Sequence, residues 1–437
     1  MDTLLPVAMA VLALTGIIAG YRVAFVLAGC AAIFILISDL PTAFFKLIVS
    51  RVYANVLSNW LLVAVPMFIF MGLVLEKSGV AERSLRAAQQ ALGGTPVGMA
   101  VSVLVVGVLL AASSGIVGAS VVLLAFLAMP RLLENGYDKP AACGLIAASG
   151  TLAILIPPSI MLIVLGDQLQ TPIPSMFAGA IGPGLLLVAL YTVLLLVKSR
   201  RLRAPVSNRS APTIGFTRLL LDIGPLLMLV ICVLGSIMAG IATPTEASGV
   251  GALGALLITA LYGRFSLRVT MEAARSTVTT TSMVLLVMIG ATCFSAVFRG
   301  IGGDELVRQG LESLGTDPWI TLSVVMLAIF LLGFVLDWLE ITLILIPIFA
   351  PVIAALDFGN GLNAETILIW FGLLVAVNLQ TSFLTPPFGF SLFYLKGALK
   401  DQVSTTDIYR GVMPFIALQI IALLLLVLFP SIITTFI

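Results

Sequence analysis

The stretch ASGTLAILIPPS, residues 148–159, interrupts a long apolar segment with two consecutive prolines. Pro157 and Pro158 each lack a backbone N–H and clash with the preceding turn, so a helix must break there. The stretch NLQTSFLTPPFG, residues 378–389, repeats this pattern in a second apolar segment. Each break leaves backbone carbonyls without helical partners. The sequence therefore predicts two broken helices at corresponding places in the chain.

The composition is that of a polytopic membrane protein. Of the 437 residues, 60% are apolar, 10% are charged and none is histidine. A soluble domain carries roughly 25% charged residues, and no segment here is long and polar enough for a soluble catalytic domain. The net charge of +2 gives no electrostatic basis for binding nucleic acid. We therefore expect an all-α, multi-pass protein surrounded by the lipid bilayer.

Runs without charged residues mark the membrane spans, because an ionised side chain in hydrocarbon costs several kcal/mol. The motif Thr243-Pro244-Thr245-Glu246 predicts a capping box at the start of one of these spans. The ten predicted spans are 4–20, 23–38, 57–75, 140–166, 174–197, 221–241, 244–262, 276–298, 364–395 and 411–436.

The segment 87–130 is too long for one span and has a polar centre at Ser113-Ser114-Gly115. Its two apolar arms, 97–112 and 116–130, each hold about 15 residues, or roughly 23 Å of helix, against a hydrocarbon core of roughly 30 Å. We therefore expect a re-entrant hairpin that enters and leaves the membrane on one face.

A second re-entrant hairpin is predicted over 318–356. Its arms, 319–335 and 341–356, flank the sequence LDWLE, which places Asp337 and Glu340 at an intramembrane tip. These carboxylates could ligate cations, carry protons or act only through helix-end electrostatics in a water-filled cavity.

Basic residues set the orientation, because cytoplasmic loops are enriched in Lys and Arg. With both hairpins re-entrant, 18 of the 22 basic residues lie inside and four lie outside. Both termini are then periplasmic, the first hairpin opens to the cytoplasm and the second opens to the exterior. The four outer residues are Lys46, Arg51, Arg299 and Arg308.

The two halves share one plan with opposite orientation. Each has three spans, an amphipathic segment, a hairpin, a broken helix and a last span; the amphipathic segments are 82–92 and the start of 265–298. Such an inverted repeat is typical of secondary transporters, in which broken segments of both halves meet at a midplane site. The chain divides into 1–92 and 93–197, a cytoplasmic linker over 198–220, and then 221–316 and 317–437.

The tips and broken helices offer hydroxyls, free carbonyls and half-helix ends. This set suits a small hard cation such as Na⁺ and, between the tips, an anionic solute. The alternative is that the small polar residues only pack and the proline pairs are kinks. The residues expected to contact the solute are Ser114, Thr151, Asn378 and Thr385.

Four motifs, in this order and spacing, resemble the large membrane subunit of TRAP (tripartite ATP-independent periplasmic) transporters, the DctM-type permease. They are GYDK (136–139), ASGTLAILIPPS (148–159), TPTEA (243–247) and LTPPFG (384–389). The resemblance implies an elevator-type, Na⁺-driven importer of organic anions, usually carboxylates or sugar acids, in a bacterial inner membrane. It implies no cofactor other than the coupling ion. The implied partners are a small four-span membrane subunit and a periplasmic solute-binding protein.

By the same resemblance, the hairpins, the broken helices and the spans after them form the moving domain. The remaining spans and the amphipathic arms form the scaffold. Carried over by motif, one Na⁺ site would use Ser113, Ser114, Gly115, Gly150, Thr151 and Pro157, and the other would use Asp337, Thr342, Ser382 and Thr385. At the second tip, relatives often have a small or Met residue before the Asp and a Thr soon after it, whereas Trp338 and Glu340 intervene here.

Other functions fit the sequence less well. A serine intramembrane protease lacks its base, because the chain has no histidine. An aspartyl protease would need paired carboxylates, but the topology puts Asp138 and Asp304 on opposite faces. We therefore expect no enzyme activity, and two closed hairpins in inverted halves favour alternating access over a channel. A single-component carboxylate or ion transporter of the same superfamily, coupled to Na⁺ or H⁺, remains the alternative.

Overall fold

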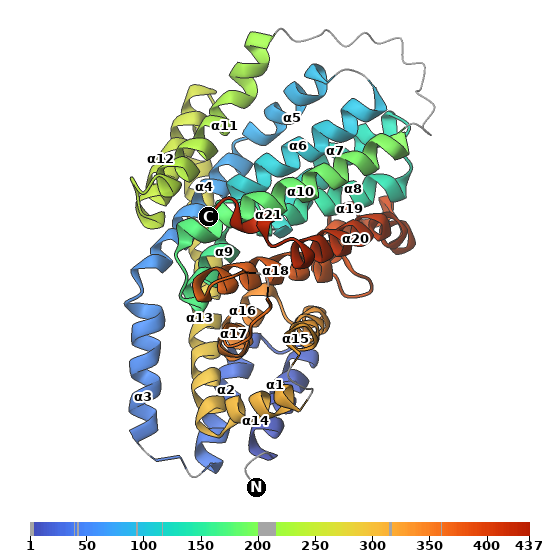
Figure 1. Cartoon of the computed structure of the whole chain (residues 1–437). Helices are drawn as coiled ribbons and strands as arrows, with labels where there is room; N and C mark the ends of the chain where they lie inside the picture. Colours follow the sequence, from blue (N-terminus) through green and yellow to red (C-terminus); the bar gives the residue numbers. More distant parts are fainter. Residues whose placement is uncertain are drawn as a thin grey trace.

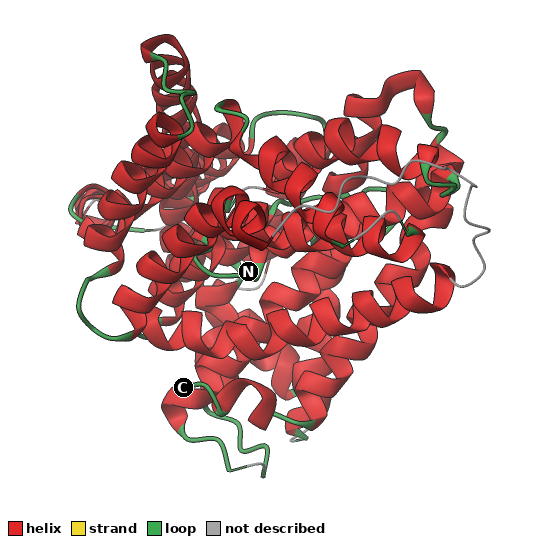
Figure 2. Cartoon of the chain, turned by 90° about the horizontal axis from the view of Figure 1, so that it is seen from above, coloured by secondary structure: helices red, strands yellow, loops and turns green. Residues whose placement is uncertain are grey.

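The computed structural model describes residues 4–38, 40–41, 43–92, 95–115, 117–199, 216–313, 317–359 and 361–437. Within these ranges every regular element is a helix (Figure 2). Eight of the described helices are long and apolar enough to cross a membrane. Most of the predicted linker 198–220 lies outside the described residues.

The first half of the chain contains ten α-helices (Figure 1). They are α1 (Leu4–Ile18), α2 (Val23–Ile37), α3 (Ala43–Val52), α4 (Ala64–Lys77), α5 (Val80–Ala91), α6 (Pro96–Ser114), α7 (Val117–Glu134), α8 (Lys139–Thr151), α9 (Ile160–Leu169) and α10 (Ile173–Ser199).

The second half repeats this order with local changes. Its helices are α11 (Phe216–Met238), α12 (Pro244–Leu261), α13 (Leu267–Gly300), α14 (Gly303–Glu312), α15 (Pro318–Leu332), α16 (Trp338–Ile344), α17 (Ile346–Ala354), α18 (Ala364–Leu384), α19 (Phe390–Leu399), α20 (Thr405–Leu428) and α21 (Ser431–Thr434).

The contacts between the halves are reciprocal, as an inverted repeat requires. Helix α2 packs on α13, and its counterpart α12 packs on α4. Helix α5 packs on α11, and α14 packs on α1. Helix α8 packs on α20 and α18 on α10, while α7 contacts α19 and both α16 and α17 contact α9. The predicted inverted repeat with two hairpins and two broken helices is confirmed.

The amphipathic helices were matched wrongly from the sequence. The counterpart of α5 is α14, a short helix that was not predicted, and both follow a glycine with positive φ, Gly79 (73°) and Gly302 (88°). Helix α3, also not predicted, corresponds to the start of α13. The first half is interrupted between α3 and α4, where the Asn59 side chain accepts a hydrogen bond from Leu61 N at 3.1 Å. The corresponding segment of the second half is uninterrupted and forms the single 34-residue helix α13.

Several predicted boundaries also move. The arms of the first hairpin are longer than expected, because α6 begins at Pro96 and α7 continues to Glu134. The second arm of the second hairpin is divided at Leu345 into α16 and α17. The predicted span 411–436 is in fact α20, and the residues after it fold back: a Cβ on Gly182 of α10 would lie 1.9 Å from Ile432 O. The capping box of Thr243 and Glu246 is confirmed.

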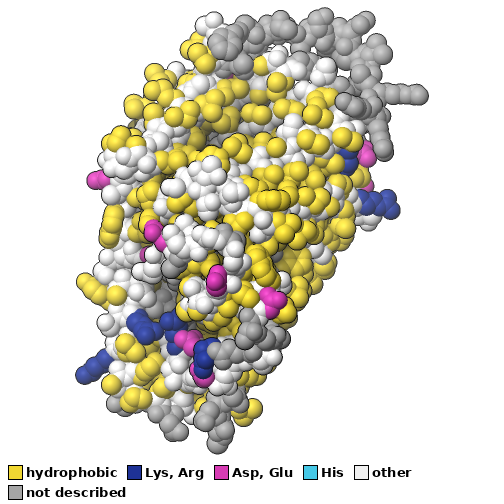
Figure 3. All heavy atoms as spheres, viewed as in Figure 1, with side chains coloured by type: hydrophobic (Ala, Val, Ile, Leu, Met, Phe, Trp, Pro, Cys, Tyr) yellow, Lys and Arg dark blue, Asp and Glu magenta, His cyan; other side chains and the backbone are white. Residues whose placement is uncertain are grey.

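The outer surface matches a protein embedded in lipid. Apolar side chains cover the middle of the face in Figure 3, while the Lys and Arg side chains gather toward its lower end and one edge. Long apolar side chains such as Leu253, Leu257 and Leu261 of α12 are 64%, 64% and 79% exposed. In water such a stripe would be costly, so these helices face the bilayer.

The two halves also approach closely where α8 crosses α20. A Cβ on Gly144 would lie 2.0 Å from Gly411 O, and a Cβ on Gly411 would lie 2.0 Å from Pro140 O. Backbone therefore meets backbone, which only glycine permits at this distance. Small residues at helix crossings are how membrane helices pack without a hydrophobic driving force.

We predict that Gly411→Ala destabilises the fold by about 1–3 kcal/mol, because the new methyl group overpacks a backbone contact. Thermal unfolding of the purified protein in detergent measures the effect. Gly397→Ala in α19 is the matched control, since nothing lies within 4 Å of its Cβ position; it should be neutral or slightly stabilising. Equal midpoints for the two variants would contradict the close crossing.

Candidate functional site

The tip of each hairpin packs against the broken helix of one half. Helix α6 ends at Ser114, and Gly115 turns the chain with a φ of 60°. A Cβ on Gly115 would lie 3.3 Å from Ile160, the first residue of α9. In the second hairpin, a Cβ on Gly333 would lie 2.4 Å from Ser382 Oγ on α18. The tips thus close onto the interruptions in the broken helices.

Each interruption carries a serine that bridges it. The Ser159 hydroxyl donates to Ile154 O at 2.6 Å, and the Ser391 hydroxyl donates to Phe383 O at 2.6 Å. The sequence predicts free carbonyls at the breaks, but these two carbonyls accept hydrogen bonds. The bond joins the end of one half-helix to the start of the next, which fixes where the second half-helix begins.

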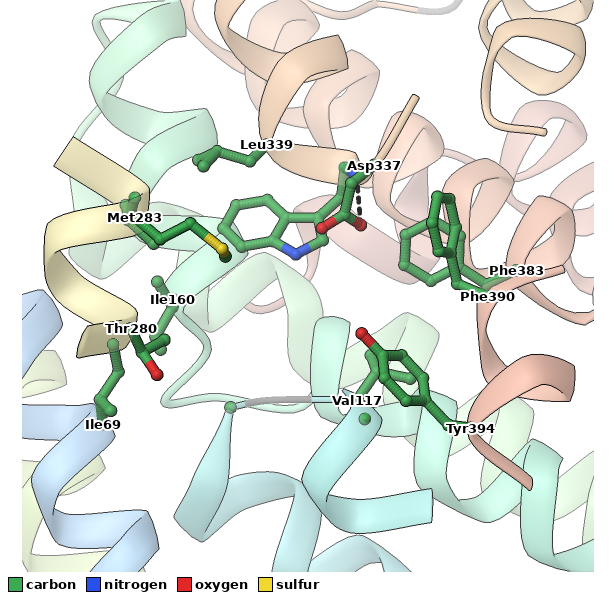
Figure 4. A pocket seen from close by; sticks show the side chains of 14 residues that line it. Ile69, Val117, Ile160, Thr280, Met283, Asp337, Leu339, Phe383, Phe390 and Tyr394 are labelled. Atoms are coloured by element: carbon green, nitrogen blue, oxygen red, sulfur yellow. Dashed lines mark hydrogen bonds between the residues drawn. The ribbon is translucent and has the colours of Figure 1, made fainter. Parts of the chain in front are cut away.

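One cavity lies where the tips, the half-helices and the scaffold helices meet (Figure 4). It measures about 130 Å³. In Figure 4 the Tyr394 hydroxyl points toward Asp337, Phe383 and Phe390 lie to one side and Met283 lies across from them. We call it the central cavity. Its lining comprises Ile69, Gly115, Val117, Gly118, Ile160, Thr280, Met283, Val284, Asp337, Trp338, Leu339, Phe383, Phe390 and Tyr394.

Three helix N-termini line the central cavity. The first residues of α7, α9 and α19, which are Val117, Ile160 and Phe390, all line it. The N-terminus of a helix carries roughly half a positive charge and unpaired N–H groups, which favour an anion. No Lys or Arg lines the cavity among the described residues. An anion there would therefore be held by helix ends rather than by cationic side chains.

The second tip contributes negative charge. Asp337 is the N-cap of α16, and its Oδ1 accepts a hydrogen bond from Trp338 N at 2.8 Å. Glu340 lies one turn further along α16, is 6% exposed and has an Oε2 atom without a hydrogen-bond partner. Glu340 is therefore inside a helix rather than at the turn itself. Asp337 faces the cavity, and Glu340 does not line it.

The predicted site residues fall into three groups. Gly115 and Asp337 line the central cavity. The side chains of Ser113 and Ser114 lie outside the described part of the chain, and only their backbone at the end of α6 can be placed. The remaining predicted site residues are buried beside the interruptions or turned toward neighbouring helices.

Three predicted hydroxyls bond within their own helices. Thr342 donates to Trp338 O at 2.7 Å, Ser382 to Leu379 O at 2.9 Å and Thr385 to Thr381 O at 2.8 Å. A hydroxyl that donates in this way keeps its oxygen lone pairs available. The three hydroxyls lie at the second tip and the second interruption, so the structure brings them to one region.

Asn378, Gly150 and Pro157 do not line the central cavity. The Asn378 amide donates to Met326 O of α15 at 2.7 Å, which ties α18 to the first arm of the second hairpin. A Cβ on Gly150 would lie 2.4 Å from Val121, so this glycine allows α8 and α7 to pack.

Thr151 lies at the junction of the two halves. Its hydroxyl donates to Ala148 O at 2.9 Å and accepts from Gln380 Nε2 of α18 at 3.3 Å. Both residues are fully buried, and Gln380 Oε1 has no partner. Gln380 was not predicted as a site residue, although a glutamine buried in the middle of an apolar span is itself the signal.

Two other contributions were missed. Tyr394 closes the cavity from α19, and a Cβ on Gly118 would meet its ring at 2.9 Å. Thr280, Met283 and Val284 of α13 form the scaffold wall. Neither has a local signal in the sequence, because their role depends on how the two halves pack.

The comparisons with known proteins agree with this architecture. The family model described as "Tripartite ATP-independent periplasmic transporter, DctM component" matches residues 7–432. This chain belongs to that family. It is thus a transmembrane permease component of a transport system, and the family resemblance inferred from the motifs is confirmed.

Curated relatives of this permease cover most of its length. The ectoine TRAP transporter large permease protein TeaC of Halomonas elongata is 31% identical, over 85% of this chain and 84% of that protein. The C4-dicarboxylate TRAP transporter large permease protein DctM of Pseudomonas aeruginosa is 27% identical, over 86% and 85%. The isethionate TRAP transporter permease protein DctMQ of Oleidesulfovibrio alaskensis is 29% identical over 88% of this chain, which spans 59% of that protein.

Two solved structures share the fold. The YdaH transporter of Alcanivorax borkumensis superposes with a TM-score of 0.63 at 14% identity, covering 98% of both chains. MtrF of Neisseria gonorrhoeae superposes with a TM-score of 0.55 at 12% identity, covering 89% of this chain and 83% of that one. At this identity the likeness concerns the fold alone.

We predict that Thr151→Val destabilises the permease by about 1–3 kcal/mol, because it leaves the buried Gln380 amide without a partner. Gln380→Leu in the same chain should recover most of the loss by removing both unpaired polar atoms. Thermal unfolding of the four members of this double-mutant cycle measures the coupling. Strictly additive losses would show that the two residues do not interact.

Proposed function

We propose that this permease takes up an organic anion together with Na⁺ through alternating access. The observation that carries the proposal is the central cavity, where three helix N-termini and the Asp337 carboxylate face one small space. Positive helix ends suit the anionic group of a solute, and a carboxylate with nearby carbonyls suits a hard cation.

The coupling follows from the charges in the cavity. An anion close to Asp337 is repelled by it in a low-dielectric space, and this repulsion falls when a cation binds to the carboxylate. The cation in turn binds more tightly when the anion is present, since linkage is reciprocal. Solute and Na⁺ would then load together, which is the requirement for symport.

The solute class is a carboxylate or sugar acid, or a related small acid. The solutes named for the relatives, a C4-dicarboxylate, isethionate and 2,3-diketo-L-gulonate, are all organic anions. Ectoine, named for a further relative, carries a carboxylate within a zwitterion. A site built from helix termini recognises the shared acidic group and leaves the rest of the solute to the apolar wall.

Movement in this proposal is of the elevator type. The hairpins, the broken helices, α10 and α20 form one body, and α1 to α4 with α11 to α13 form the scaffold. The central cavity lies between them, since Ile69 and Met283 come from the scaffold and Asp337 from the moving body. Sliding the body along α13 would carry the solute from one side of the membrane to the other.

The proposed assembly has three components, of which two lie in a bacterial inner membrane and one in the periplasm. The DctMQ protein, of which this chain matches 59%, is named for a joined large and small permease, which supports a separate small membrane subunit as the first partner here. A periplasmic solute-binding protein is the second partner.

The test is solute uptake into proteoliposomes that contain the permease and its small subunit. Uptake should require both the binding protein and an inward Na⁺ gradient. Uptake without the binding protein would move the permease to the single-component class, and uptake indifferent to Na⁺ would contradict the coupling argument.

We predict that Asp337→Asn abolishes the Na⁺ dependence of uptake and lowers its rate by at least about tenfold, because a neutral amide cannot offset a bound cation. Asp357→Asn is the matched control: this carboxylate lies in an exposed loop, where it accepts from Gly359 N at 2.9 Å. The control should transport like the unaltered protein. Normal Na⁺-driven uptake by the Asp337 variant would show that this carboxylate does not couple the ion.

A further inference from the structure

A second polar cavity lies beside α13, further toward its C-terminal end. It measures about 90 Å³. We call it the outer cavity. Its lining comprises Arg51, Asn55, Gln168, Met288, Thr292, Ser295, Ala296, Arg299, Leu343 and Pro347. Nothing in the uptake mechanism above uses it.

Two of the four basic residues assigned to the outer side of the membrane, Arg51 and Arg299, line this one cavity. Arg51 is in the last turn of α3 and forms no ion pair with any residue that the structure describes. A guanidinium presents five N–H donors and no acceptor. The Arg51 guanidinium is therefore available to a ligand.

Arg299 is only partly occupied by protein groups. Its Nη2 donates to Pro347 O at 2.8 Å, and its Nε lies 3.5 Å from Asp304 Oδ2. That Nε is buried and makes no hydrogen bond. Asp304 offsets part of the charge of Arg299, and a donor that is buried and unused has capacity for an anionic oxygen.

The other carboxylate nearby is already held. Asp167, at the end of α9, accepts from Asn59 Nδ2 at 3.0 Å and from Gln168 Nε2 at 3.0 Å. Two carboxylates, Asp167 and Asp304, therefore lie near the two arginines. Asp167 is held by amide donors, and Asp304 pairs with Arg299 and not with Arg51. The donors left facing the cavity are Arg51, Asn55 and Ser295.

The outer cavity joins the two bodies of the permease. Arg51, Asn55 and the α13 residues belong to the scaffold, while Gln168, Leu343 and Pro347 belong to the hairpin and broken-helix body. Helix α13 also lines the central cavity, through Thr280, Met283 and Val284. From Val284 to Thr292 along the same face is about 12 Å of helix.

We infer that the outer cavity is an anion-binding site, which receives the acidic group of the solute before the solute reaches the central cavity. This inference rests on the proposed uptake of an organic anion. The size of the cavity suits a carboxylate or sulfonate group rather than a whole solute. A planar guanidinium with neighbouring amide and hydroxyl donors is the usual protein ligand set for such a group.

The inference is tested without transport, by labelling a cysteine in the cavity. In the permease with its small subunit, the native Cys30, Cys143, Cys232 and Cys293 are replaced by alanine, and Ser295→Cys supplies the reporter. Labelling rates are measured for two methanethiosulfonate reagents, one bearing a sulfonate and one bearing a trimethylammonium group. Each rate is divided by the rate of the same reagent with a free thiol in solution. We expect the anionic reagent to be favoured by about tenfold, because a cleft lined by charges of one sign carries a potential of several kT.

Arg51→Gln should lower that preference at least threefold. Lys46→Gln is the matched control, because it removes the same charge from the same helix at an exposed position outside the cavity. Inorganic sulfate should slow labelling by the anionic reagent in a saturable way, and chloride at equal ionic strength should not. Thr292→Cys serves as a second reporter if the first variant is unstable.

Equal rates for the two reagents, or an equal effect of Arg51→Gln and Lys46→Gln, would overturn the inference. Slowing by sulfate no greater than by chloride would show a general field without a binding site, which also overturns it. Because none of these readings needs Na⁺ or uptake, a failure of the symport proposal leaves them unchanged. If symport holds, Arg51→Gln should raise the solute KM for uptake while the maximal rate stays near that of the unaltered protein.

Discussion

The structure depends on one constraint: a polar backbone group inside a bilayer must find its partner within the protein. Pro157-Pro158 and Pro386-Pro387 interrupt two helices in the membrane interior and so create polar ends that lipid cannot satisfy. The hairpin tips cover those ends, Ser159 and Ser391 each take one carbonyl, and the remaining ends face a shared cavity. The polar ends at the breaks are thus covered by the hairpin tips. The tips reach these ends because the two halves pack reciprocally.

The same constraint explains why the site needs few charged side chains. A cation or anion site made from helix ends is fixed in place by the fold. It requires no ionised side chain in the membrane interior. Asp337 is the exception, and as the N-cap of α16 it is held by a backbone bond from Trp338. Specificity for one solute can then reside in the apolar wall from α13 and α19, which varies without disturbing the helix ends.

Much of this could be predicted from the sequence, because proline pairs, charge-free runs and the distribution of basic residues each report directly on a membrane fold. The hairpins, the broken helices and their inverted repetition follow from those signals. The roles of Gln380, Tyr394 and the wall of α13 could not be predicted, since they arise from contacts between segments far apart in the chain. Helices α3 and α14 were missed because each is short and amphipathic, with too few apolar residues to count as a span.

The proposed symport requires that the cavity between the tips binds Na⁺ before any transport occurs. Equilibrium binding of radioactive sodium to the purified permease, measured without a gradient or a binding protein, tests it most directly. We expect saturable binding that Asp337→Asn weakens strongly and Asp357→Asn leaves unchanged. Binding that is not saturable, or that is the same in both variants, would contradict it.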